Sequence, residues 1–278
     1  MNQQMERIRI IALGVIIFTG CNSDSLINRK TRDENPAAIP IREYSVGNVL
    51  WQQNAAEKRA LYYQAYNIAR IHLDHILSSE VENHKHYAIV TDLDETVLDN
   101  SFFNAKLIQN DVEYTQEMWG EWVNLEKAEI IDGAEAFFKY AESKGVEIFY
   151  VSNRSLSSYE ATISNLKRFD LPFLDREHIL LKTTSSGKEP RRQKIMEKHH
   201  IIMLLGDNLS DFSLVFDNQD TFRRNLLVDS LMSEFGQRFI VFPNPMYGDW
   251  ETKGVYEGKY DWTATQKDSL RKAKLVGY

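Results

Sequence analysis

One stretch of sequence decides the fold of this chain: His86-Tyr87-Ala88-Ile89-Val90-Thr91-Asp92-Leu93-Asp94-Glu95-Thr96. Its short apolar segment predicts a buried strand. The strand delivers Asp92 and Asp94 at its C-terminal end, the edge where open α/β sheets bind ligands. Two carboxylates this close repel each other, so a cation is needed to keep both usable. The stretch predicts a reactive pair in which one carboxylate attacks and the other serves as acid or base. The alternative is an acidic turn that caps the next helix.

Three more predicted strands end in groups suited to phosphoryl transfer. The groups are Ser152-Asn153 after the strand over 146–151, Lys188 after the strand over 179–181, and Asp207 with Asp211 after the strand over 201–205. Catalysis of that reaction depends mostly on positioning and on charge neutralisation. A hydroxyl group binds phosphate oxygens, a lysine balances charge, and clustered carboxylates favour one octahedral Mg²⁺ that keeps several waters.

Each of these residues also has a plain structural explanation. Ser152 could only cap the following helix, and carboxylates such as Asp207 and Asp211 are favoured in a first helical turn. Lys182, Arg191 and Arg192 lie close in the sequence, and any of them could supply the positive charge in place of Lys188. The conjunction of all these groups at one sheet edge favours an active site over the separate explanations.

Strand and helix signals alternate through residues 86–242, which predicts an α/β fold with a parallel sheet covered by helices on both faces. Apolar residues at helical spacing predict a long amphipathic helix over 54–77. Further helices are expected at 132–145, 157–168, 188–199, 211–216 and 221–235, and a last strand at 239–242. We expect one domain over 46–278, with smaller, mainly helical cap segments at about 46–80 and 101–131.

The four strand ends together resemble the motifs of the class C (lipoprotein) acid phosphatases, a bacterial branch of the haloacid dehalogenase (HAD) superfamily. The matching segments are 92–101, 150–154, 186–192 and 206–212, within a likeness that runs from about 49 to 251. The resemblance implies a HAD-like, Rossmann-like sheet. It also implies a Mg²⁺-dependent acid phosphatase that hydrolyses phosphate monoesters.

Matching positions imply a role for each motif residue. Asp92 is the nucleophile that forms an aspartyl-phosphate, and Asp94 is the general acid and base. Phosphate binds to Ser152, Asn153 and Lys188. The metal ligands are Asp92, the main-chain oxygen of Asp94, Asp207, and Asp211, the last mostly through metal-bound water.

Two aromatic residues point to the substrate class. Trp119 and Tyr247 align with the pair that sandwiches a nucleobase or another aromatic leaving group in nucleotidase members of the family. Stacking of this kind contributes about 1–3 kcal/mol per base and tolerates any base. The resemblance therefore implies that nucleoside 5′-monophosphates are among the substrates. Trp122 lies one helical turn from Trp119, on the same face of the predicted helix, so it could equally serve helix packing rather than substrate binding.

The N-terminal residues predict export and a lipid anchor. Arg7 and Arg9 precede an apolar run over 10–18 and small residues, the order of a secretory signal over 1–20. Cys21 is the only cysteine and follows that signal, as in a bacterial lipobox, where the thiol is acylated. We expect residues 21–45 to be a flexible tether. The domain would then be held in the cell envelope, at the outer membrane or in the periplasm or at the cell surface.

Composition agrees with a compact domain and excludes one class of partner. The chain of 278 residues is 43% hydrophobic and has a formal net charge of −7, whereas nucleic-acid polymers demand a basic face. Two alternatives to the phosphatase stay open, a different HAD phosphotransferase and a non-catalytic surface lipoprotein that binds a small ligand such as haem. The seven histidines show no fixed metal-binding spacing. The sequence leaves a homodimer open.

Overall fold

The protein is described by a computed structural model over residues 40–79 and 86–278. The predicted signal peptide (1–20), Cys21 and most of the predicted tether (21–45) lie outside the described residues. What the sequence predicts for these segments therefore stays a prediction.

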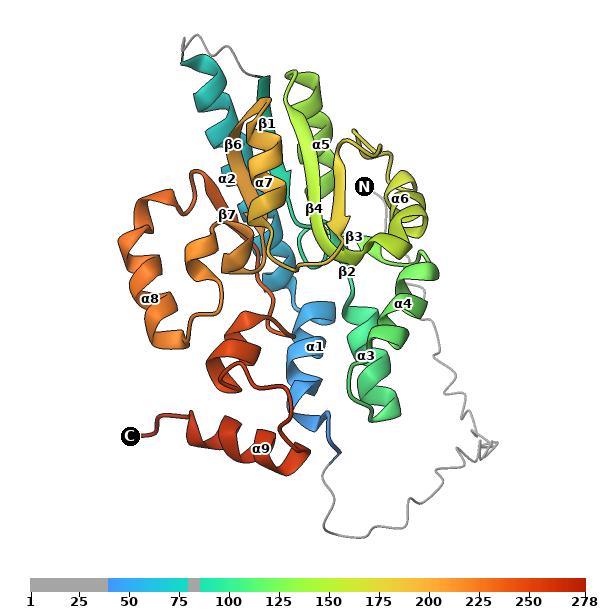
Figure 1. The fold of residues 1–278 in the computed structure, drawn as a ribbon, viewed down its shortest axis with the longest axis vertical. Coiled ribbons are helices and arrows are strands. Elements are labelled where there is room, and N and C mark those ends of the chain that lie inside the picture. Colours follow the sequence, from blue (N-terminus) through green and yellow to red (C-terminus); the bar gives the residue numbers. More distant parts are fainter. Residues whose placement is uncertain (1–39, 80–85) are drawn as a thin grey trace, which may run out of the picture. The chain divides into compact units, whose positions relative to one another are not determined.

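A five-stranded parallel sheet, with strand order β5-β4-β1-β6-β7, lies at the centre of the described chain (Figure 1). The strands are β1 (His86–Thr91), β4 (Glu147–Ser155), β5 (Ile179–Lys182), β6 (His199–Gly206) and β7 (Phe239–Val241). The strand that leads into Asp92 and Asp94 is the central one, paired with β4 on one side and β6 on the other. The predicted α/β class with a parallel sheet is confirmed.

Both faces of the sheet are buried under helices. Along β1, Ile89 belongs to one apolar cluster, and Ala88 and Val90 belong to the other, as the two-residue period of a strand requires. The first cluster includes residues of α2 (Ala56–Ser78), α5 (Ala134–Ser143) and α6 (Tyr159–Lys167), and the second includes Ile195 of α7 (Glu189–Met196). The predicted covering of both faces is therefore confirmed.

Helix α2 is part of the core. Tyr66 and Leu73 are buried against the sheet, and the Tyr66 ring lies 4.8 Å from that of Phe242. The Tyr66 hydroxyl donates to the carbonyl oxygen of Thr96 at 2.7 Å, so α2 also supports the loop after β1. Residues 56–78 thus form a layer on the sheet, whereas the sequence placed them in a cap segment.

Several helices gather at the carboxyl ends of the strands (Figure 1). They are α1 (Val46–Asn54), α3 (Ser101–Asn110), α4 (Gln116–Asn124) and α9 (Ala264–Ala273), and a two-stranded pair of β2 (Leu98–Asp99) and β3 (Glu129–Ile130) joins this region to the loop after β1. Lys267 of α9 binds Glu113 at 3.0 Å. Arg42 is buried and its amide donates to Asp111, so the last residues of the predicted tether pack on this group.

Two boundaries differ from the prediction for reasons of strand pairing. Strand β4 does not stop at Val151 but continues to Ser155, which pairs with Lys182 beyond an irregularity in the register. Helix α7 ends at Met196 because the strand β6 begins at His199 and pairs with β1. The predicted helix over 211–216 is two 3₁₀ turns, Leu209–Asp211 and Leu214–Phe216.

The C-terminal helices are shorter than predicted or were not predicted. Helix α8 covers Thr221–Ser230, a π-helix covers Trp250–Val255, and α9 follows. Within 40–79 and 86–278, no helix combines the length and the apolar character that crossing a bilayer requires.

Candidate active site

A tight loop fixes the backbone of the two leading carboxylates. The Asp92 amide donates to the carbonyl oxygen of Leu205 at 2.9 Å, which fastens the end of β1 to β6. Leu93, between Asp92 and Asp94, is fully buried. The next residue, Glu95, has a φ of 62°, a left-handed conformation that few non-glycine residues adopt. The loop thereby turns back directly after Asp94.

Lys188 joins two of the predicted carboxylates. Its Nζ lies 2.5 Å from Oδ1 of Asp92 and 2.6 Å from Oδ1 of Asp211, and all three side chains are buried. Although burial lowers it, the charges of Asp211 and Asp92 hold the pKa of Lys188 above its usual value. Lys182 is the last residue of β5, so this geometry favours Lys188 as the charge-balancing lysine.

Three carboxylates form a cluster around this lysine. Asp92, Asp207 and Asp211 each offer an oxygen, and these oxygens lie within 4.8 Å of one another. Burial raises the pKa of Asp92 to about 7, although Lys188 opposes the shift. Burial, with the charges of Asp211 and Asp92, raises the pKa of Asp207 well above its usual value.

The cluster fits a divalent metal ion. One lysine lies among three carboxylates, and burial with the neighbouring carboxylates raises the pKa values of Asp92 and Asp207, so a nearby cation would favour their charged forms. A set of hard oxygen donors is what Mg²⁺ and similar ions prefer. Asp211 already accepts hydrogen bonds at both oxygens, from Lys188 and from the Asn208 amide at 3.0 Å. This occupancy agrees with contact to a metal mainly through water.

The fourth motif contains a glycine that the cluster requires. A Cβ atom added to Gly206 would lie 2.4 Å from the side chain of Asp211. Asp211 can bend back over the end of β6 only because residue 206 has no side chain, and its carboxylate also closes a capping box with Asn208. Asp207 is held separately, by the Asn244 side-chain amide at 2.8 Å.

Asp94 is bound by residues that the sequence analysis did not single out. Arg154 donates to its carboxylate from Nε and Nη2, with the shortest contact at 2.7 Å. The side-chain amide of Asn100 donates to the same carboxylate at 3.0 Å, and the Asn100 oxygen accepts from the indole of Trp122 at 2.8 Å. Trp122 is thus a polar support of this contact as well as a packing residue. Arg154 lies in the second motif, but its pairing with Asp94 depends on the β1–β4 register.

Two of the predicted phosphate-binding residues, Ser152 and Asn153, differ in exposure, and only Ser152 contacts Asp94. Ser152 is fully buried, with its Oγ 3.4 Å from Oδ2 of Asp94. Asn153 is exposed, and its Oδ1 accepts from Nη2 of Arg191 at 2.7 Å. The same guanidinium donates from Nη1 to the carbonyl oxygen of Ser152 at 2.6 Å. Arg191 therefore fixes this part of β4, a role that its position in the first turn of α7 does not reveal from sequence.

The two predicted stacking residues lie near the Asp94 side of the site. Trp119 is half-buried, and its ring centre lies 5.8 Å from the guanidinium carbon of Arg154. The Tyr247 hydroxyl donates to Oε2 of Glu95 at 2.6 Å. Burial and the charge of Asp94 raise the pKa of Glu95 well above its usual value. Both aromatic residues are therefore tied to neighbours of the proposed acid.

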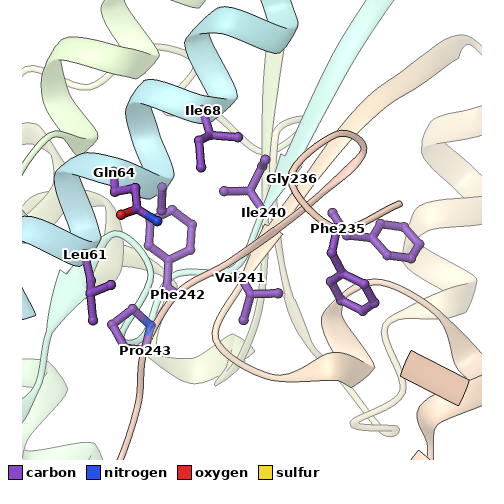
Figure 2. A pocket seen from close by; sticks show the side chains of 11 residues that line it. Leu61, Gln64, Ile68, Phe235, Gly236, Ile240, Val241, Phe242 and Pro243 are labelled. Atoms are coloured by element: carbon purple, nitrogen blue, oxygen red, sulfur yellow. The ribbon is translucent and has the colours of Figure 1, made fainter. Parts of the chain in front are cut away.

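An apolar groove among the described residues is separate from this chemistry. It has a volume of about 330 Å³ and lies between α2 and the segment that includes β7 (Figure 2). Leu61, Ile68 and Val241 line it, and no carboxylate does. The groove therefore does not include the residues that the sequence predicts for catalysis.

The chain is similar to proteins of known sequence and structure. The chain matches a family profile described as HAD superfamily, subfamily IIIB (Acid phosphatase), over residues 26–250. It is similar to a class C acid phosphatase of Bacillus anthracis, with a TM-score of 0.82 and 42% identity over 86% of this chain and 100% of the other. A second structure of that enzyme, with the same values, has tungstate bound. A stem 31 kDa glycoprotein of Glycine max is 24% identical over 214 residues, covering 75% of this chain and 72% of that protein.

The family model spans most of the chain, and the resemblance noted from the sequence motifs is confirmed. The chain belongs to the HAD superfamily, subfamily IIIB, the acid phosphatases.

Proposed function

We propose that this acid phosphatase is a metal-dependent phosphomonoesterase that works through an aspartyl-phosphate on Asp92. The observation that carries the proposal is the placement of Asp92, in contact with Lys188 and within the Asp207–Asp211 cluster. Asp94, two residues away, is held in a different set of contacts. The two carboxylates thus have separate environments, as separate roles require.

Each step has a residue to perform it. A carboxylate oxygen of Asp92 attacks phosphorus as the bond to the leaving oxygen breaks, and Asp94 gives that oxygen a proton. Asp94 then takes a proton from water as the water oxygen attacks phosphorus. The bond to Asp92 breaks and phosphate leaves. Lys188 offsets the charge near Asp92, and Ser152 with Asn153 donates to phosphate oxygens.

The acidic cluster would hold one Mg²⁺ per chain through Asp92, Asp207, the main-chain oxygen of Asp94 and, through water, Asp211. The ion would neutralise charge on the phosphate and on the cluster. Tungstate is a tetrahedral oxyanion like phosphate, so its presence in the Bacillus anthracis enzyme supports an oxyanion site in this chain.

Substrates with an aromatic leaving group, nucleoside 5′-monophosphates included, suit this site. The support is that Trp119 and Tyr247 are attached to the surroundings of Asp94, the residue that faces the leaving group. Loss of either ring should therefore weaken nucleotide turnover more than turnover of small alkyl phosphates.

The cell-envelope location stays part of the proposal. Acylation at Cys21 and a tether would hold the enzyme at a membrane, where small phosphate monoesters reach it. A surface lipoprotein that only binds a ligand would not require the arrangement of Lys188 between two carboxylates. Another HAD phosphotransferase would pass the phosphoryl group to an acceptor other than water.

The test is phosphate release from an aryl phosphate and from a nucleoside 5′-monophosphate by the full chain, with Mg²⁺ and with a chelator. Turnover should require the metal and should fall by at least about a hundredfold in Asp92→Asn. Metal-loaded, folded protein that releases no phosphate from either compound would refute the proposal.

A further inference from the structure

The carboxylate of Asp94 forms an ion pair with an arginine that the mechanism above does not use. Arg154 is 1% exposed and lies on the extension of β4 beyond Val151. Its Nε donates to both oxygens of Asp94, and its Nη2 donates to Oδ1 at 2.7 Å. A guanidinium fixes a carboxylate plane in a way that a lysine ammonium cannot.

The contacts make the two oxygens of Asp94 unequal. Oδ1 accepts from Arg154 Nε at 3.0 Å, from Arg154 Nη2 at 2.7 Å and from Asn100 Nδ2 at 3.0 Å. Oδ2 has two longer contacts, to Arg154 Nε at 3.2 Å and to Ser152 Oγ at 3.4 Å. Oδ2 thus accepts fewer and longer hydrogen bonds than Oδ1, and it is the oxygen that contacts Ser152, a proposed phosphate-binding residue.

Arg154 also contacts the proposed aromatic subsite. Its guanidinium carbon lies 5.8 Å from the Trp119 ring centre, within the range of a cation–π contact. Thr162 lies 3.5 Å from its Nη1 on the other side. One buried cation therefore joins the carboxylate of Asp94 to a ring proposed to hold the leaving group.

We propose that Arg154 is a positioning residue that holds Asp94 through Oδ1 and thereby assigns proton transfer to Oδ2, an inference that rests on the proposed function. The Oδ2–H bond of Asp94 breaks as the phosphorus–oxygen bond breaks. The leaving oxygen keeps the electron pair of that bond and receives the proton. Arg154 stabilises the carboxylate that remains and keeps Oδ2 directed for the return step, in which it accepts a proton from water.

The test is the dependence of Arg154 variants on the leaving group. Phenyl phosphate and 4-nitrophenyl phosphate have the same ring, but nitrophenolate leaves readily without a proton and phenolate does not. A misplaced acid should therefore affect phenyl phosphate more. We expect kcat/KM of Arg154→Lys to fall at least about tenfold further for phenyl phosphate than for 4-nitrophenyl phosphate. Arg176→Lys, an exposed arginine paired with Glu160, is the matched control and should change neither.

A double-mutant cycle separates positioning from general support. If Arg154 acts through Asp94, Arg154→Lys should cause little further loss in the Asp94→Asn background. Equal losses on both substrates, or a full additional loss in Asp94→Asn, would overturn the inference while leaving the phosphatase proposal intact. An unmodified chain inactive on both substrates would overturn the proposed function, and the inference with it.

A measurement on the unmodified chain avoids any folding defect of the variants. In a crystal structure with tungstate bound, Oδ2 of Asp94 should be the carboxylate oxygen nearer to the oxyanion, with Arg154 still on Oδ1. An oxyanion beside Oδ1, or an Arg154 that has left Asp94 to bind the oxyanion itself, would contradict the assignment.

Discussion

At the scale of single residues, the site depends on the absence of a side chain at one position and on an unusual backbone conformation at another, as well as on its carboxylates. Gly206 leaves room for Asp211 to reach Lys188, and the left-handed φ of Glu95 turns the loop after Asp94. These features cost stability in isolation. The conformation of Glu95 persists because its loop is anchored in the core through Leu93.

Gly206→Ala tests whether Asp211 needs the space that Gly206 leaves. The new Cβ would meet the Asp211 carboxylate at 2.4 Å, so Asp211 must move away from Lys188. We expect activity to fall at least about tenfold and stability by about 1–3 kcal/mol, as overpacking does. The measurements are phosphate release and urea unfolding.

Gly47→Ala provides the matched control. Gly47 lies in α1, and a Cβ there meets nothing within 4 Å. This change should stabilise the protein by about 0.4–1 kcal/mol and leave activity unchanged. Normal activity in Gly206→Ala would show that the position of Asp211 does not matter.

Tyr247→Phe and Tyr247→Ala separate two roles of one residue. Phenylalanine keeps the ring but removes the hydroxyl that donates to buried Glu95 at 2.6 Å. We expect a loss of about 1–3 kcal/mol in stability, with the preference for nucleotides over alkyl phosphates retained. Alanine should lose that preference as well. Selectivity that survives in Tyr247→Ala would exclude the stacking role.

At the scale of elements, the two ends of the parallel sheet serve different purposes. The carboxyl ends of the strands carry the carboxylates of the site. At the opposite end, Glu147 of β4 accepts from His178 at 3.0 Å and from His199 of β6 at 3.2 Å. His178 also contacts Asp175 at 2.8 Å, so this cluster ties β4, β6 and the approach to β5 together without facing the site.

The cluster around Glu147 predicts a pH dependence of stability. Although burial alone raises it, hydrogen bonds and charges from His178 and His199 hold the pKa of Glu147 below its ordinary value of 4.5. The stability this gives is complete above pH 4.5 and is lost as pH falls through the lower folded value. At about pH 6, Glu147→Gln should lose about 1.5–3 kcal/mol, since the bonds involve a charged acceptor.

The difference between Glu147→Gln and the unmodified chain should shrink as pH falls through the lowered pKa of Glu147, because both chains are then uncharged at residue 147. Urea unfolding at several pH values measures it. Glu160→Gln, which breaks an exposed pair with Arg176, should have a far smaller effect. A loss from Glu147→Gln that is constant with pH would show that the residue acts through packing alone.

The sequence predicted the parallel sheet well because its strands follow from local apolar patterns, although β4 continues past Val151 to Ser155. The apolar run before Asp92 predicted the central strand, and Asp207 directly follows β6 as expected. Ser152, however, lies inside β4, and Lys188 lies at the start of α7 rather than at the end of β5. Other roles depend on distant pairings that one segment cannot reveal. Arg154 meets Asp94 across 60 positions only through the β1–β4 register, and the place of α2 in the core depends on partners such as Phe242.

At the scale of the whole molecule, the apolar layers on both faces of the sheet stabilise a fold that brings several carboxylates close together. The raised pKa values of Asp92 and Asp207 mean that burial, and then the nearness of other carboxylates, disfavours their charged forms in the folded chain. A metal ion that binds only the folded chain offsets this effect and raises the apparent stability.

Thermal unfolding should therefore respond to the metal. Millimolar Mg²⁺ should raise Tm relative to a chelator, and Asp207→Asn should both remove most of that rise and raise Tm in the chelator, because one of the crowded charges is gone. A Tm that is the same in Mg²⁺ and in chelator for the unmodified chain would indicate that the cluster holds no ion.

The most direct test of the central claim is to trap the covalent intermediate. The full chain would be mixed with a phosphate monoester and Mg²⁺, quenched in acid within one turnover and analysed by mass spectrometry of its peptides. The account predicts one phosphoryl group on the peptide that contains Asp92, located on that residue and absent from Asp92→Asn. Continued turnover with no phosphorylated peptide, or with the group on another residue, would contradict it.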